Sequence, residues 1–166
     1  LVGEPSLYEL SSSGEFNLYV NVLSPDIKEA SKDYSVSIYK DGNLFKTLDG
    51  LDYEWESFYE HFAGDNYFKG PELDYAKAPS GLYEIVISSP DNNGKYVLAV
   101  GKIEKFGIMD TIRTIFTLPN LKSSFFEKSI LTSYSNYIGI FILLFFTLFS
   151  GLIYLIFKIV KKIRNQ

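Results

Sequence analysis

Residues 137–157 read YIGIFILLFFTLFSGLIYLIF, a stretch of 21 residues without a charged side chain. An α-helix of that length is about 31 Å long, which matches the roughly 30 Å hydrocarbon core of a bilayer. Fifteen of the 21 residues are Ile, Leu or Phe, which are among the residue types that most favour insertion. The stretch therefore predicts one C-terminal transmembrane helix over 137–157.

The charges on either side of this span predict its orientation. Four basic residues lie within 158–166, whereas Lys122 and Lys128 precede the span and Glu127 partly offsets them. By the positive-inside rule, 158–166 is a basic cytoplasmic tail and the preceding part of the chain lies outside the cell membrane. We also expect a secretory signal peptide to be removed before Leu1, which would give the same topology.

The composition divides the chain into two unlike parts. Residues 1–105 carry 9 basic and 18 acidic side chains, and residues 106–166 carry 7 basic and 2 acidic ones. An acidic outer part argues against nucleic acid as a partner. The chain has no Cys and one His, which excludes disulfides, iron–sulfur clusters, thiolate zinc sites and multi-histidine metal sites. The lack of Asn-x-Ser/Thr sequons and the usage rich in Lys, Asn, Ile, Phe and Tyr favour a prokaryotic source.

Alternating apolar and polar residues indicate β-strands in the outer part. The alternation runs through residues 16–22, 34–39, 83–87 and 96–100, and turn-forming residues lie at 41–43 and 90–94. Several short strands with such turns between them are typical of an antiparallel sandwich. The predicted class is mainly β, a jelly-roll-like β-sandwich ectodomain over 1–105, followed by amphipathic neck helices and the transmembrane helix.

Two of these strands repeat a Gly-x-Tyr-x-apolar-x-apolar pattern, GLYEIVI at 81–87 and GKYVLAV at 94–100. Together with VSIYKDG at 36–42, residues 15–101 resemble the bacterial pre-peptidase C-terminal domain, a small jelly-roll-like β-sandwich of secreted prokaryotic proteins. Residues 49–79 depart from that pattern and are interpreted as an insertion. Because the family is mostly non-catalytic, the resemblance implies an accessory or binding module and supplies no active-site residues.

The insertion begins with an acidic cluster. Asp49, Asp52 and Glu54 could supply oxygen ligands to Ca²⁺, which takes six to eight of them. Their spacing matches no known calcium loop. The preferred interpretation is a solvated strand face over an aromatic core, because carboxylates are usually exposed.

Aromatic side chains are dense in the same segment. They form either a recognition surface for a protein or a glycan, or a cap over the open end of the sandwich, and the sequence leaves both interpretations open. The candidate partner-binding residues in this segment are Tyr53, Trp55, Phe58, Tyr59 and Phe62.

No catalytic motif accompanies these residues. His61 could be drawn into a Ser-His-Asp triad, but the Gly-x-Ser-x-Gly string is absent. Glu54 and Glu60 could be drawn as a glycosidase pair, but among 18 acidic residues a chance pair is expected. The chain is therefore predicted not to be an enzyme, and no cofactor is expected.

Residues 106–136 form a neck between the ectodomain and the span. The segment is too apolar to lie free in water, so we expect it to dock on the outer leaflet, on a partner protein or back on the sandwich. Pro119 is expected to end its first helix. The residues predicted to share one face of that helix are Ile108, Ile112, Ile115 and Phe116.

Within the span, Thr147 and Gly151 form a small-x-x-x-small pair that lets another helix approach closely. The combined prediction is a non-catalytic single-pass accessory subunit of a larger prokaryotic membrane complex. It would dock on other membrane-protein subunits through its ectodomain, neck and transmembrane helix. The alternative is a membrane-tethered module that binds a glycan outside the cell, with or without Ca²⁺.

Overall fold

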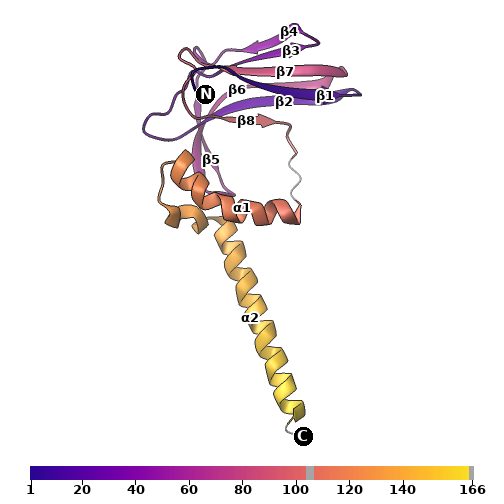
Figure 1. The fold of residues 1–166 in the computed structure, drawn as a ribbon, viewed down its shortest axis with the longest axis vertical. Helices are drawn as coiled ribbons and strands as arrows, with labels where there is room; N and C mark the ends of the chain where they lie inside the picture. The colour runs from indigo at the N-terminus through magenta and orange to yellow at the C-terminus, as the bar shows by residue number, and fades with distance from the viewer. Residues whose placement is uncertain (104–106, 165–166) are drawn as a thin grey trace.

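The computed structural model describes residues 1–103 and 107–164, apart from the side chain of Ile108. A β-sandwich lies at one end, a group of short helices lies beneath it, and a long helix extends away from both (Figure 1). The mainly β class and the long apolar C-terminal helix are thus as predicted. The strands are β1 (Ser6–Ser12), β2 (Phe16–Pro25), β3 (Ser35–Lys40), β4 (Asn43–Leu48), β5 (Glu56–Glu60), β6 (Asp65–Ala78), β7 (Gly81–Ser88) and β8 (Val97–Val100).

The strands form two antiparallel four-stranded sheets, in the orders β1-β7-β3-β4 and β5-β6-β2-β8. The alternation that predicted β2, β3 and β7 places their apolar side chains between the sheets. These core side chains are at most 1% exposed: Leu18, Val20, Val22, Val36, Ile38, Tyr83, Ile85 and Ile87.

Residues 49–79, interpreted as an insertion, form an integral part of the sandwich. They supply β5 and the 14-residue β6, and β6 pairs with both β5 and β2. The Gly70-Pro71 pair, a combination typical of turns, lies inside β6, where the register with β2 shifts. The Asn21 amide donates to the carbonyls of Gly70 and Pro71 at 3.0 and 3.3 Å, which stabilises this irregular stretch.

The two Gly-x-Tyr segments do not pair with each other as the two strands of a hairpin would. Strand β7 lies in the first sheet and β8 pairs with β2 in the second. The turn at 90–94 therefore starts a connection between the sheets.

Four helical segments follow the sandwich: α1 (Ile108–Asn120), the π-helical η1 (Leu121–Phe125), the 3₁₀-helical η2 (Ile130–Tyr134) and α2 (Tyr137–Arg164). The prediction that Pro119 ends the first helix is wrong, since α1 continues through it into η1. A proline has no N–H for the carbonyl four residues earlier, here that of Ile115. The hydroxyl of Tyr134 donates to that carbonyl at 3.0 Å and replaces the missing bond.

Helix α2 is the one helix of the described chain that is long and apolar enough to cross a membrane. None of the 18 residues in its most apolar stretch is buried against the rest of the protein. It runs for 28 residues, or about 42 Å, so residues 158–164 of the predicted tail continue the same helix.

Candidate docking site at the hairpin–neck junction

The turn between β5 and β6, residues 61–64, reaches down to the helices and is called the hairpin tip below (Figure 1). The Glu60 carboxylate accepts hydrogen bonds from the backbone N–H groups of Phe62 and Ala63, both at 2.6 Å. Gly64 closes the turn with a φ of 72°, and a Cβ there would lie 3.0 Å from the Cβ of Asn136. The tip is therefore held in shape by its own residues and lies close against the neck.

A buried ion pair fastens the neck to this hairpin. Asp65 is fully buried at the start of β6, and its carboxylate accepts from the ammonium of Lys122 at 2.6 Å and from that of Lys128 at 3.0 Å. The side chain of Lys122 is 1% exposed and that of Lys128 is 30% exposed. Because an unpaired buried charge is costly, the neck and the hairpin are stable only together in this arrangement.

The Asn136 side chain connects the hairpin tip to α2. Its amide donates to the Ala63 carbonyl at 2.7 Å, which also accepts from Lys122 at 2.8 Å. Its amide oxygen accepts from the Gly139 N–H at 3.1 Å, the geometry of a helix N-cap. The start of α2 is thus fixed by a residue that also holds the sandwich.

The aromatic ring of Phe126 covers the ion pairs between Asp65 and the two lysines. Phe126 is 2% exposed, and its ring meets that of Tyr67 edge to face at 5.3 Å. The ammonium groups of Lys122 and Lys128 lie 5.6 and 5.4 Å from the centre of the Phe126 ring, within the range of cation–π attraction. Burial, and then the negative charges of Asp65 and Glu60, raise the pKa of Tyr67 well above its ordinary value, so its phenol stays neutral here.

A second contact comes from the connection before β8. The Lys95 ammonium donates to the carbonyls of Ser124 and Phe125 at 2.8 and 3.3 Å and pairs with the Glu127 carboxylate at 2.8 Å. A cation at the C-terminal carbonyls of a helical turn is electrostatically favourable. The neck is therefore attached to the sandwich at two separate places.

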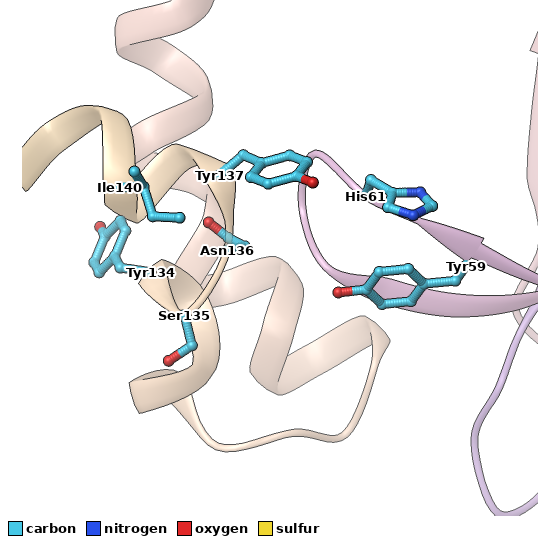
Figure 2. A pocket seen from close by; sticks show the side chains of 7 residues that line it. All are labelled: Tyr59, His61, Tyr134, Ser135, Asn136, Tyr137 and Ile140. Atoms are coloured by element: carbon cyan, nitrogen blue, oxygen red, sulfur yellow. The ribbon is translucent and has the colours of Figure 1, made fainter.

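Beside the junction lies an open pocket of about 310 Å³. Figure 2 shows Tyr59 and His61 on the hairpin side of the pocket, with the Tyr59 hydroxyl directed toward the end of η2 and the first turn of α2. The rings of Tyr59 and His61 meet edge to face at 4.9 Å. Phenols, an imidazole and an amide in one half-open pocket suit a partner with both apolar and hydrogen-bonding groups. The lining residues are Tyr59, His61, Tyr134, Ser135, Asn136, Tyr137 and Ile140.

The structure divides the predicted aromatic set. Trp55 packs against the core: its indole N–H donates to the Gly50 carbonyl at 2.9 Å and its ring lies edge to face with Tyr34. It therefore caps the sandwich, as one of the two interpretations had it. The exposed members of the set, between 39% and 53%, are Tyr53, Phe58, Tyr59 and Phe62.

The acidic residues proposed for Ca²⁺ do not converge. The chain bends at residues 50–53 and becomes a strand again only at Glu56, so Asp49, Asp52 and Glu54 do not form the strand face that was the preferred interpretation. Asp49 instead accepts from the Leu51 N–H at 2.9 Å. Within 1–103 and 107–164, no group of three or more His, Cys, Asp or Glu side chains could hold a metal ion.

The residues predicted to form the apolar face of α1 also differ in their exposure. Ile112 and Phe116 are exposed, Ile115 is half-buried, and the side chain of Ile108 lies outside the described part. The buried contact of this helix comes from Leu118, which is 2% exposed. Part of the apolar face therefore packs on the protein and part remains on the surface.

The two small residues of the span have different surroundings. The Thr147 hydroxyl donates to the Leu143 carbonyl at 2.8 Å within the helix. A Cβ at Gly151 would meet nothing within 4 Å. The surface around Gly151 is thus open to close approach by another helix.

Sequence reasoning missed the residues that make the junction, namely Asp65, Lys122, Lys128 and Asn136. Asp65 reads as a turn residue and the two lysines as flanking charges, because these residue types are normally exposed. Comparisons of the chain with protein-family models, curated proteins and solved structures found no match. Function therefore has to be inferred from this geometry.

Proposed function

We propose that this protein is a non-catalytic single-pass accessory subunit of a larger prokaryotic membrane complex, with the β-sandwich outside and the end of α2 in the cytoplasm. One observation carries the proposal: α2 is uncovered along its most apolar part, while its first residues are fastened to the sandwich through Asn136 and the Asp65–Lys122 pair. An apolar helix exposed on every side needs lipid or other helices around it. A rigid attachment at its outer end sets how the sandwich is presented to a neighbour.

The charges support the proposed orientation. The last turn of α2 carries Lys161, Lys162 and Arg164. On the other side of the span, Lys122 and Lys128 are both paired with Asp65. The positive charge is therefore concentrated at the C-terminal end of α2, where the positive-inside rule places the cytoplasm.

Two surfaces are proposed to meet the partner subunits. In the bilayer, Gly151 and the adjoining Thr147 offer a place where a second helix can pack closely. Outside, the edge strand β5 presents Phe58 and Tyr59 next to the open pocket. Exposed aromatic residues on an edge strand are typical of protein interfaces.

The resemblance to the pre-peptidase C-terminal domain, with its jelly-roll-like sandwich, remains a prediction that agrees with this function. A module of that kind is an accessory to other proteins. The two residues considered above for catalytic sets, Glu60 and His61, make structural contacts in this chain. Glu60 shapes the hairpin tip, and the ring of His61 lies against the ring of Tyr59.

The test is to extract the protein from its native membrane in a mild detergent and to determine the mass and composition of the particle. We expect a stoichiometric membrane-protein partner. We also expect that Gly151→Leu weakens the association, whereas Ile153→Phe, an enlargement on the other side of α2, does not. Migration as a lone chain of 18.9 kDa would contradict the proposal. Glycan binding would then be the function to measure.

A further inference from the structure

Helix α1 carries a row of exposed apolar side chains that the sandwich does not cover. Met109, Ile112 and Phe116 are 74%, 44% and 78% exposed. Their spacing of three, four and seven residues places them on one face of the helix. We call these three residues the apolar ridge of α1. Asp110 and Thr117, also exposed, lie farther around the helix on its polar side, whereas Arg113, four residues after Met109 and three before Phe116, borders the ridge.

The position of α1 relates this ridge to the membrane span. Helix α1 runs crosswise to α2, at the end where α2 begins (Figure 1). An apolar hollow of about 360 Å³ separates the two helices at this point. The residues that line the hollow come from the hairpin tip, from α1 and from the first turns of α2: Phe62, Thr111, Thr114, Ile115, Ile138 and Phe141. Helix α1 is therefore at the level at which the proposed span enters the bilayer.

The position of α1 along the axis of α2 is also fixed. The Tyr134 hydroxyl ties the end of η2 to the Ile115 carbonyl in the middle of α1, and α2 begins three residues after Tyr134. The buried Lys122 follows directly after the end of α1. Hydrogen bonds therefore hold α1 both at Ile115 and at the residues after its C-terminal end, and α1 cannot move away from the start of α2 without breaking them.

From these observations we propose that α1 lies along the outer membrane–water interface, with its apolar ridge toward the lipid acyl chains. The proposal rests on α2 spanning the membrane. The ridge then continues the lipid-facing surface of α2, and acyl chains fill the apolar hollow, which water would occupy unfavourably. Arg113 borders the ridge, and its long side chain extends to the lipid phosphates. The sandwich is thereby held by two membrane contacts and has a fixed tilt.

The absence of Cys from the chain allows a direct test with single nitroxide labels. The protein is reconstituted in vesicles of phosphatidylethanolamine and phosphatidylglycerol. Labels are placed at Phe116→Cys and Ile112→Cys on the ridge, at Thr117→Cys on the polar side of α1 as the matched control, and at Leu148→Cys in the span. Collisions with oxygen, which partitions into lipid, are compared with collisions with a water-soluble nickel chelate.

We expect the ratio of oxygen to nickel collisions at Phe116→Cys and Ile112→Cys to be several-fold above that at Thr117→Cys and to approach that at Leu148→Cys. Equal exposure of Phe116→Cys and Thr117→Cys to the nickel chelate would overturn the proposal. Shielding of Phe116→Cys from both reagents would also overturn it, in favour of a protein partner on the ridge. A water-exposed Leu148→Cys would show instead that the span itself, and with it the proposed function, is wrong.

Discussion

The core of the sandwich and the hairpin–neck junction are both buried, but they are built from different chemistry. Between the sheets, side chains such as Val20, Ile38 and Ile85 are nearly or fully buried and apolar. At the junction, Asp65 and Lys122 are equally buried and are charged. Apolar burial stabilises without a strict direction, whereas a buried ion pair requires its partners at one place. The core therefore holds the sandwich together, and the junction fixes how the sandwich sits on α2.

The largest expected effect comes from removing the buried carboxylate. Asp65→Ala leaves Lys122 buried without its counter-ion, which costs about 3–5 kcal/mol. We expect this loss in the free energy of opening of the junction, measured by site-resolved amide hydrogen exchange in detergent. Faster exchange should be confined to the hairpin tip and the neck. Asp74→Ala, which breaks the exposed pair with Lys102, is the control and should cost less than about 1 kcal/mol.

A double replacement sharpens this prediction. Asp65→Leu combined with Lys122→Met fills the site with apolar groups, and such exchanges of buried ion pairs are often neutral. The Ala63 carbonyl keeps its hydrogen bond from Asn136. We expect the double variant to regain most of the lost stability. A double variant as unstable as Asp65→Ala would mean that the charges are needed for a reason other than mutual compensation.

The matching change in the core is Ile85→Ala. Ile85 is 1% exposed, and shortening a buried Ile leaves a cavity that costs about 2–5 kcal/mol. In contrast to Asp65→Ala, we expect hydrogen exchange to accelerate through both sheets, because the core is shared. Acceleration confined to β7 would contradict the view that the two sheets unfold together.

A smaller effect is expected at Pro119. Tyr134→Phe removes the donor to the Ile115 carbonyl and should cost about 1 kcal/mol. In a Pro119→Ala background the backbone supplies an N–H for that carbonyl, so the same change should cost less. Thermal unfolding of the four proteins of this cycle measures the difference. An equal cost of Tyr134→Phe in both backgrounds would show that the hydroxyl does not replace the missing bond.

The smallest effect is an acid dependence on the sandwich surface. The Lys69 ammonium, and then the Tyr19 hydroxyl, hydrogen-bond to Glu72 and hold the pKa of its carboxyl below the ordinary value of 4.5. The resulting stability is present above pH 4.5 and is lost as the pH falls toward the lowered pKa. Because the pair is exposed, Glu72→Gln should cost less than about 1 kcal/mol at pH 7. The difference in unfolding temperature between the two proteins should shrink at acidic pH, and a difference that grew there would contradict the account.

The sequence predicts the parts of the molecule whose signals are local. Strands β2, β3 and β7 follow from alternation within a few residues, and the span follows from a continuous apolar run. Strand β6 is missed because Gly70-Pro71 resembles a turn, and only the distant Asn21 shows why a strand can pass through it.

The junction could not be predicted for the same reason. Asp65 and Lys122 are 57 residues apart, and neither has neighbours that indicate burial. Likewise, the continuation of α1 through Pro119 depends on Tyr134, which lies beyond the end of the helix. Residues that act through directional, long-range partners leave no periodic pattern in the sequence. For the same reason the sequence shows that residues 53–62 are rich in aromatic side chains, but not which of them pack in the core and which lie on the surface.

The most direct test of the central claim, a sandwich held outside the cell by one membrane span, is residue accessibility in intact cells. Ser13→Cys lies in the exposed connection between β1 and β2, and Lys161→Cys lies in the last turn of α2. Each is introduced singly into the chain, whose residues 1–166 contain no Cys, and is treated with a membrane-impermeant maleimide. We predict that Ser13→Cys is modified in intact cells and Lys161→Cys only after permeabilisation. Modification of Lys161→Cys in intact cells, or protection of Ser13→Cys, would contradict the account.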